Sequence, residues 1–365
     1  MRFEIERGVL SEMLSAVVNL LPNRTTYTVL LNVLVEVADG KLRLSGTDLD
    51  TFVRKETALE GKTEEGRVVL PGRKLAEICR EMGGATMLLH SKEMTVHAES
   101  AGAKTRFSGL DPAEYPEMPK MPEGAALDFP IPGVLELLDA VSFAISRDES
   151  RPAMTGVNWE VSKTAMKMVA TDGHRLGYVS RKGKFSSTFR QIVSARFLSL
   201  LPRSQETVSV RQDPGRIALS TADTLAIGRP IEGPYPDYDR VLPRSEHPYK
   251  AVLDHEPFSA ALRRAAVFAN PVGRLTSLAF SAGKVKIQAE TSDVGSSEEE
   301  LGCEYTGEPL KIGFNVGYVL EILRRIPGDK IVLELQNPNS AGIFKPHEKN
   351  PEMEMTYLVM PIRLD

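Results

Sequence analysis

The sequence has few cysteines, few aromatic residues and no long hydrophobic run. Only two of its 365 residues are cysteines, and Cys79 and Cys303 lie far apart among apolar neighbours. This favours reduced core thiols over a disulfide framework or a zinc site. No apolar stretch reaches the roughly 18 residues that span a membrane, and acidic residues near the N-terminus are atypical of a signal peptide. We therefore expect a cytoplasmic protein.

The sequence also lacks a strong excess of either charge. It has 45 basic and 49 acidic residues, which give a formal net charge of -4. Domains that coat nucleic acid through bulk electrostatics are usually strongly basic, so the net charge argues against this mode of binding. DNA held in another way stays possible.

Common catalytic signatures are missing as well. We find no GxxxxGK[ST] phosphate loop, no GxGxxG after a strand, and no HExxH, CxxC or GxSxG motif. One cluster, Thr171 to Arg175, contains Asp172 and His174, which could act as an acid-base pair. The alternative is turn chemistry around the Asp-Gly pair, and no third residue is evident that would orient the histidine.

What is present is a composition of 42% hydrophobic and 26% charged residues, typical of a globular protein with ample core. A chain of this length is expected to divide into two or three domains.

An internal repeat organises the chain. Three segments carry apolar residues at i, i+3, i+4 and i+7, the spacing of one helix face, and each follows the previous one by 124 residues. The positions are Leu10, Met13, Leu14 and Val17, then Val134, Leu137, Leu138 and Val141, then Phe258, Ala261, Leu262 and Ala265.

Each predicted helix is followed by a predicted strand pair, at 33–48, 157–172 and 278–293. The first pair has an Asp39-Gly40 turn and the third a Gly283 turn, both typical of hairpins. A second helix then recurs at 71–82, 194–201 and 315–326, and an alternating strand follows each one.

Proline-rich stretches separate the repeats and are expected to be linkers or edge segments. We place the domain boundaries near residues 122 and 246, which gives domains 1–122, 123–246 and 247–365. Each domain is predicted to be α+β, with two helices and several antiparallel strands.

Basic residues recur on or after the predicted helices, among them Arg24, Arg73, Arg147 and Arg151. One interpretation is a solvated helix face with arginine favoured near helix C-termini. The other is a track of cations for phosphates, without sequence readout.

Four motifs in one order resemble the bacterial DNA sliding clamp, the beta subunit of DNA polymerase III. They are ATDGHRL (170–176), PDYDRVLP (236–243), GFNVGYVLEIL (313–323) and YLVMPIRL (357–364). The resemblance covers the whole chain. It implies the DNA clamp fold, in which two three-domain protomers form a homodimeric ring of six similar domains around duplex DNA.

The resemblance further implies a hydrophobic cleft that binds short linear peptides from partner proteins. Methionine, leucine, valine and proline side chains suit such a cleft. Carried over to this sequence, its residues are Met154, Thr171, Gly173, His174, Arg175, Leu176, Pro236, Arg240, Val241, Val359, Met360, Pro361, Ile362 and Arg363. Without the family, Met360 and Pro361 would be interpreted as part of an ordinary final strand. The terminal Asp365 carboxylate beside Arg363 is expected to reshape one edge of the cleft.

The same mapping implies DNA contacts by Arg24, Arg73, Arg147 and Arg151. It also implies a head-to-tail dimer interface through paired edge strands, in which glutamates oppose cations. The interface residues are Lys104, Arg106, Phe107, Val267, Phe268, Glu298, Glu299, Glu300 and Glu304. Alternatively, Phe107 is a core residue and the segment SSEEE (296–300) is a polar loop.

The resulting hypothesis is a non-enzymatic processivity factor that needs no cofactor or metal. Its expected partners are double-stranded DNA, the replicative polymerase, the clamp loader, translesion polymerases and repair proteins. A nucleic-acid-processing enzyme using Asp172 and His174, and a three-domain scaffold that never meets DNA, are the alternatives.

Overall fold

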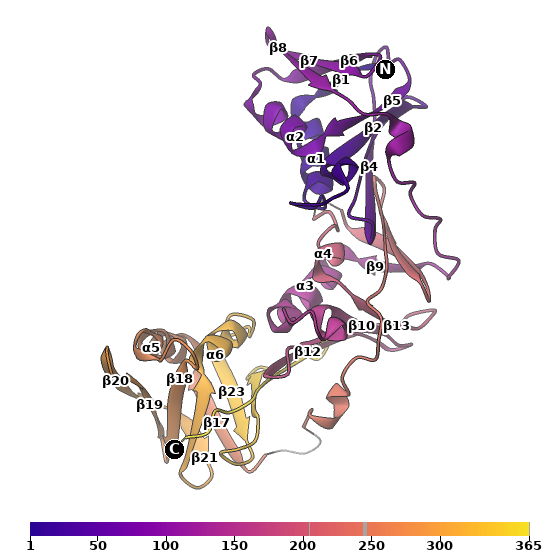
Figure 1. Ribbon diagram of the computed structural model, residues 1–365. Helices are drawn as coiled ribbons and strands as arrows, with labels where there is room; N and C mark the ends of the chain where they lie inside the picture. The colour runs from indigo at the N-terminus through magenta and orange to yellow at the C-terminus, as the bar shows by residue number, and fades with distance from the viewer. Residues whose placement is uncertain (204, 244–246, 365) are drawn as a thin grey trace. The chain divides into compact units, whose positions relative to one another are not determined.

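The computed structural model describes residues 1–203, 205–243 and 247–364. The contacts within the chain divide it into two compact units, whose helices and strands are labelled in Figure 1. Unit 1 comprises Met1–Leu135 and Arg196–Pro230, and unit 2 comprises Glu136–Ala195 and Ile231–Asp365. Asp365, whose effect on the cleft was an expectation, lies outside the described residues, as does the predicted boundary at 246. The domain boundaries stay predictions.

The described residues form six α-helices, two for each sequence repeat. They are α1 (Arg7–Val18), α2 (Gly72–Glu81), α3 (Ile131–Val141), α4 (Ala195–Leu198), α5 (His255–Phe268) and α6 (Val316–Leu323). All twelve predicted apolar positions on α1, α3 and α5 are buried, which confirms the predicted helix faces. None of the described helices is long and apolar enough to cross a membrane.

The helix α4 is shorter than predicted. Residues after Leu198 continue in tighter turns, since the Leu200 and Leu201 amides bond to carbonyls three residues back. Pro202 then follows and has no amide hydrogen with which to continue the helix.

Unit 1 contains two antiparallel sheets. The first has eight strands in the order β5 (Gly66–Pro71), β2 (Asn32–Ala38), β3 (Lys41–Thr47), β4 (Thr51–Ala58), β16 (Thr224–Gly228), β15 (Arg216–Ser220), β14 (Thr207–Asp213) and β9 (Leu127–Pro130). The second has the order β1 (Arg2–Glu6), β6 (Thr86–Lys92), β7 (Thr95–Ser100) and β8 (Ala103–Ser108). Helices α1 and α2 pack on each other, and α1 also packs on β3 and β4.

Unit 2 also contains two antiparallel sheets. The nine-stranded sheet has the order β13 (Phe189–Val193), β10 (Val157–Val161), β11 (Ala165–Thr171), β12 (Arg175–Lys182), β25 (Met353–Val359), β24 (Gly342–Pro346), β23 (Lys330–Leu335), β17 (Tyr249–Asp254) and β21 (Glu304–Thr306). The four-stranded sheet has the order β20 (Gly295–Gly302), β19 (Lys284–Thr291), β18 (Leu275–Ser281) and β22 (Leu310–Asn315). Helices α5 and α6 pack together beside this smaller sheet.

Five short 3₁₀-helices lie among the described residues. They are η1 (Thr28–Leu31), η2 (Pro112–Glu114), η3 (Ser142–Ala144), η4 (Pro152–Thr155) and η5 (Tyr238–Arg240). The η2 and η5 helices occupy the proline-rich stretches that the sequence assigned to linkers or edges.

The predicted hairpins are confirmed by their turns. Asp39 and Gly40, between β2 and β3, have φ values of 53° and 69°, the pair of positive φ angles that a type I′ turn requires. Gly283 between β18 and β19 has φ 76°. The alternative interpretation of 296–300 as a polar loop is wrong, because these residues lie within the edge strand β20.

Both cysteines are free thiols. Cys79 is buried and Cys303 is partly buried. Burial raises the pKa of both thiols, because the thiolate is less well solvated there than in water. This agrees with the expectation of reduced thiols rather than a disulfide.

An ion pair spans the junction of β4 and β16. The Lys55 side chain is only 4% exposed, and its Nζ lies 2.8 Å from Oδ2 of Asp223. Burial of Asp223 opposes its ionisation, but hydrogen bonds from Lys55 and Thr224 outweigh this, so its pKa is lowered. The carboxylate therefore stabilises the fold at pH values above its unfolded-state pKa, and this contribution is lost as the pH falls toward the folded-state pKa.

Asp223→Ala should lower the free energy of unfolding by about 3 kcal/mol, because it leaves the Lys55 ammonium group buried without a counter-ion. Urea denaturation at neutral pH measures this loss, which should shrink at acidic pH. The double variant Lys55→Met/Asp223→Ala is the control and should recover most of the stability. Equal losses in the single and double variants would contradict the role of the pair.

Candidate functional site

The turn between β11 and β12 is held by its own side chains. Oδ1 of Asp172 accepts hydrogen bonds from the backbone amides of His174 (2.9 Å) and Arg175 (3.0 Å). Oγ1 of Thr171 donates to the Arg175 carbonyl (2.8 Å) and accepts from the Gly173 amide (3.1 Å). Gly173 has φ 90°, a conformation that L side chains rarely adopt. Sequence and geometry therefore agree on a rigid turn.

The hydrogen bonds of Asp172 decide whether it can act with His174 as an acid-base pair. Oδ1 of Asp172 is taken by backbone amides, and Oδ2 accepts from Nε of Arg175 at 3.0 Å. Among the described residues the imidazole of His174 has no hydrogen-bond partner. Asp172 therefore organises the turn and does not orient the His174 ring for proton transfer.

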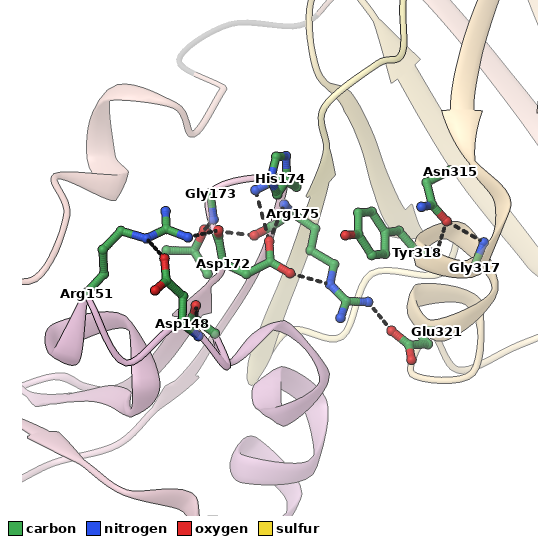
Figure 2. A network of polar contacts seen from close by, with 12 residues as sticks. Asp148, Arg151, Asp172, Gly173, His174, Arg175, Asn315, Gly317, Tyr318 and Glu321 are labelled. Atoms are coloured by element: carbon green, nitrogen blue, oxygen red, sulfur yellow. Dashed lines mark hydrogen bonds and ion pairs between the residues drawn. The ribbon is translucent and has the colours of Figure 1, made fainter. Parts of the chain in front are cut away.

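The Arg175 guanidinium lies at the centre of a polar and aromatic network, which Figure 2 shows. It pairs with Asp172 and with Glu321 of α6. Its Cζ lies 4.3 Å from the ring centroid of Tyr318 and 5.3 Å from that of Phe143. The side chain is only 11% exposed. Planar stacking and forked hydrogen bonding are both properties of arginine that lysine lacks.

The start of α6 fixes the position of Tyr318. The Asn315 side chain accepts hydrogen bonds from the amides of Gly317 (2.9 Å) and Tyr318 (3.4 Å), which is the usual role of an asparagine at a helix N-cap. Tyr318 and Glu321 are three residues apart and therefore share one helix face. The network links this face to β12 (Figure 2).

The C-terminal segment runs beside the same turn. Strand β25 pairs with β12, with Val359 opposite Arg175 and Leu358 opposite Leu176. Beyond the strand, the Met360 amide donates to the His174 carbonyl at 2.8 Å, and the Ile362 amide donates to the Gly313 carbonyl at 2.8 Å. Met360 and Pro361 thus lie after the end of β25, so their interpretation as part of an ordinary final strand is wrong.

A buried apolar cluster lies beneath this turn. Its buried members are Val169, Leu176, Tyr178, Ile192, Tyr235, Tyr238, Ile343 and Leu358. The hydroxyl of Tyr238 donates to Oε1 of Glu160 at 2.9 Å, and that of Tyr235 donates to the Val169 carbonyl at 3.3 Å. Burial raises the pKa of both tyrosines, so both stay protonated donors.

The structure brings most residues of the predicted cleft into one part of unit 2. Thr171, Gly173, His174, Arg175 and Leu176 meet Val359 and Met360 through the β12–β25 pairing. The methyl carbon of buried Met154 lies 3.8 Å from where a Cβ on Gly173 would be. Two apolar side chains stay largely exposed here, Val241 at 52% and Met360 at 49%.

The remaining predicted cleft residues flank this part of unit 2. Arg240 ends η5, whose Tyr238 belongs to the buried cluster, and Pro236 lies two residues before this helix. Arg240 is exposed and pairs with Asp237 at 2.7 Å. Pro361, Ile362 and Arg363 follow Met360, and Arg363 is exposed.

The four predicted DNA-contacting arginines are all exposed. Arg24 and Arg73 belong to unit 1, where Arg73 donates to the Leu21 carbonyl and to the Asn23 side chain. Arg147 and Arg151 belong to unit 2. Arg151 pairs with Asp148 at 2.8 Å and also approaches the Asp172 carbonyl (Figure 2).

The predicted dimer-interface residues lie mainly on two edge strands. Lys104, Arg106 and Phe107 are on β8, the edge of the small sheet of unit 1. Phe107 is itself only 7% exposed, as its alternative interpretation as a core residue requires.

The acidic side of the predicted interface is β20, the edge of the small sheet of unit 2. Its Glu298 and Glu300 pair with Lys286 and Lys284 of the neighbouring strand, and Glu299 on the opposite face pairs with Arg264. Glu304 on β21 pairs with Lys330. At the end of α5, Val267 is 69% exposed and Phe268 is partly buried.

Sequence reasoning missed three residues of the Arg175 network: Phe143, Tyr318 and Glu321. A signal for two of them was available, because Tyr318 and Glu321 have helical spacing within the motif GFNVGYVLEIL. Phe143 gave no signal, since its contact with Arg175 depends on tertiary packing.

The sequence matches three family models along its length. They describe the N-terminal domain of the DNA polymerase III beta subunit at residues 1–119, its central domain at 132–237 and its C-terminal domain at 239–363. Among curated relatives, the beta sliding clamp of Pseudomonas aeruginosa is 30% identical and that of Escherichia coli 29%, each aligned over 100% of both chains.

Solved structures are similar over the same length. A crystal structure of the DNA polymerase III beta subunit from Pseudomonas aeruginosa has a TM-score of 0.93 at 30% identity. A second structure from that organism, bound to griselimycin, has a TM-score of 0.94 at 30% identity. Both alignments cover 100% of each chain.

Arg175→Lys should destabilise the network although it keeps the charge, because lysine can neither stack on Tyr318 nor fork between Asp172 and Glu321. We expect the free energy of unfolding to fall by about 1–2 kcal/mol. Amide hydrogen exchange should also become faster at residues 173–176.

The matched control is Arg240→Lys, which changes an exposed arginine with a surface ion pair to Asp237 and should cost less than about 0.5 kcal/mol. Denaturant unfolding and hydrogen exchange measure both variants. Equal effects of the two substitutions would show that the stacked geometry of Arg175 contributes nothing.

Proposed function

Since the chain belongs to the family of bacterial beta sliding clamps, the beta subunits of DNA polymerase III, we propose that it is a processivity factor and not an enzyme. As a ring-shaped homodimer it encircles duplex DNA and tethers the proteins that work on it. The full-length match to this family carries the proposal. We further propose that its three domains meet near residues 122 and 246 and that it works in the cytoplasm.

Encirclement explains how a protein with a net charge of -4 acts on DNA. A closed ring stays on the duplex because of topology, so it needs no tight grip on phosphates and can slide. Arg24, Arg73, Arg147 and Arg151 are proposed to face the duplex. Their exposure supports this role, since an exposed guanidinium can reach phosphates without a large desolvation cost.

Ring closure is proposed to pair β8 of one protomer with β20 of the other. Both are edge strands with unpaired backbone groups on their outer side. Lys104 and Arg106 on β8 complement Glu298 and Glu300 on β20, and exposed Val267, with Phe268, adds apolar contact. Because the Phe107 ring is buried, it is proposed to support β8 from within the domain and to add little contact area to the interface.

The proposed peptide site is the surface around the 171–176 turn. Val241 and Met360 are exposed apolar residues, and Val241 is next to Leu242, which packs against the buried apolar cluster. Methionine adapts to differently shaped partners. Arg175 is proposed to hold the turn in position through Asp172 and Tyr318. One site on each protomer gives the ring two attachment points, so partners can bind together or exchange.

Loading the protein on nicked circular DNA with a clamp loader, followed by linearisation, tests encirclement. The protein should be retained on the circle and lost from the linear DNA, because it can slide off free ends. Gel filtration of the complexes before and after cutting measures retention. Circles that are left uncut but incubated identically are the control, and retention unchanged by linearisation would overturn the proposal.

Deletion of residues 360–365 tests the peptide site. It removes the Met360 side chain and the two backbone hydrogen bonds that hold the tail, so binding of a fluorescent glutamine-leucine-phenylalanine peptide should be lost. Fluorescence anisotropy measures binding, and sedimentation verifies that the dimer persists. An Arg363→Ala variant of full length is the milder comparison. Unchanged peptide affinity after deletion would exclude the tail from the site.

A further inference from the structure

Unit 1 contains a second copy of the turn that shapes the proposed peptide site. Between β3 and β4, Oγ1 of Thr47 donates to the Thr51 carbonyl (2.8 Å) and accepts from the Leu49 amide (2.9 Å). Oδ1 of Asp48 accepts from the Thr51 amide at 2.8 Å. Leu49 has φ 79°, close to the 90° of Gly173 in unit 2. A leucine keeps this unfavourable conformation because the surrounding bonds impose it.

The strand beside this turn also repeats the arrangement of unit 2. Strand β16 pairs with β4, with Gly228 opposite Thr51, as Val359 lies opposite Arg175 in unit 2. The next residue, Arg229, donates its amide to the Asp50 carbonyl at 3.0 Å. This bond is the counterpart of the one between the Met360 amide and the His174 carbonyl.

A buried tyrosine followed by a proline is also present at equivalent positions of the two units. Tyr115 is buried, and its hydroxyl lies 3.2 Å from the Asn32 and Ser45 carbonyls. Pro116 follows it, as Pro236 follows Tyr235 in unit 2. On the sheet, Arg67 pairs with Glu36 at 3.1 Å.

The ion pair between Arg67 and Glu36 also has a counterpart in unit 2, where Arg190 pairs with Glu160 at the same distance of 3.1 Å. The backbone frame of the proposed peptide site is therefore present twice in the chain.

The side chains on the two frames differ. Strand register and the turn place Arg54 where unit 2 has Tyr178, Ser45 where it has Val169, and Met118 where it has Tyr238. In unit 2 these three side chains belong to the buried apolar cluster. Unit 1 instead has a cavity of about 340 Å³, lined by Leu34, Glu36, Arg43, Ser45, Gly46, Phe52, Arg54, Arg67, Pro112, Ala113, Tyr115, Pro116, Glu117 and Met118.

The charges in this cavity are unevenly paired. Glu36 bonds to Arg43 at 3.0 Å and to Arg67 at 3.1 Å, and Arg43 also pairs with Asp39 and with Glu56, each at 3.5 Å. Arg54 is partly buried and has no ion pair or side-chain hydrogen bond within the described part of the chain. A guanidinium in partly dehydrated surroundings binds a carboxylate more strongly than one in open water. Phe52 and Met118 supply apolar surface in the same cavity.

We propose that this cavity is a second peptide-binding site, which takes an extended segment with a carboxylate side chain next to an apolar one. Arg54 binds the carboxylate, and Phe52 and Met118 contact the apolar side chain. This inference rests on the proposed function, because an extended peptide is expected where the chain repeats the backbone arrangement that is proposed to bind peptides in unit 2. The two sites share no residue, so either can fail without the other.

The test follows the methyl resonance of Met118 in full-length protein labelled at methionine methyl groups, assigned by Met118→Leu. The probe is acetyl-Leu-Glu-Phe-amide, and we expect a saturable shift. Arg54→Gln should weaken binding about tenfold, or about 1.4 kcal/mol, because it removes the charged donor. Replacing glutamate by glutamine in the probe should weaken binding similarly.

Four controls accompany this test. Arg211→Gln changes an exposed arginine on β14 of the same sheet, outside the cavity, and should leave binding unchanged. The Met360 methyl reports separately on the site in unit 2, and unchanged resonances of the other methionines verify folding of each variant. Inorganic phosphate tests for a simple anion site.

The proposal is overturned by any of four results. These are a Met118 resonance that does not move, equal affinities of Arg54→Gln and the unchanged protein, equal affinities for the glutamate and glutamine probes, and a phosphate-induced shift as large as that of the peptide.

Discussion

Antiparallel pairing between β12 and β25 is the interaction on which unit 2 depends. It joins strands from the central and C-terminal repeats into one nine-stranded sheet, through partners from Arg175↔Val359 to Arg181↔Met353. The pairing lays the end of the chain beside the 171–176 turn and fixes which side chains of β25 face the buried cluster. Both faces of β25 are packed here, because Leu358 belongs to one buried cluster and Tyr357 and Val359 belong to another. A shift by one residue would exchange side chains of different size between the two clusters.

Local features of the fold could be predicted because their causes are local. Apolar spacing determined the buried faces of α1, α3 and α5, and Asp39-Gly40 determined a tight hairpin turn. The nine-stranded sheet could not be obtained in this way, because β12 and β25 are distant in sequence and nothing near either strand identifies its partner. Strand β20 was open to interpretation as a loop for a related reason, since an edge strand with glutamates on both faces lacks the apolar alternation of a buried strand.

In the candidate site, too, the local features could be predicted from the sequence and the contacts between distant segments could not. Turn residues such as Asp172 and Gly173 could be recognised, because Asx hydrogen bonding and positive φ are encoded by the residues that make them. The roles of the cleft residues came from family resemblance. The stacking of Arg175 between Phe143 and Tyr318 was not predictable from either source, because three segments distant in sequence must pack before the contact exists.

The backbone attachment of the C-terminal segment has a consequence for protein engineering. Residues 360–362 are held through the Met360 and Ile362 amides, which bond to main-chain carbonyls of His174 and Gly313. Neither bond depends on the identity of a side chain. Substitutions at Met360 and Arg363 can therefore alter the side-chain chemistry of the proposed peptide site while the path of the chain is retained, so this tail can be redesigned without redesigning the fold.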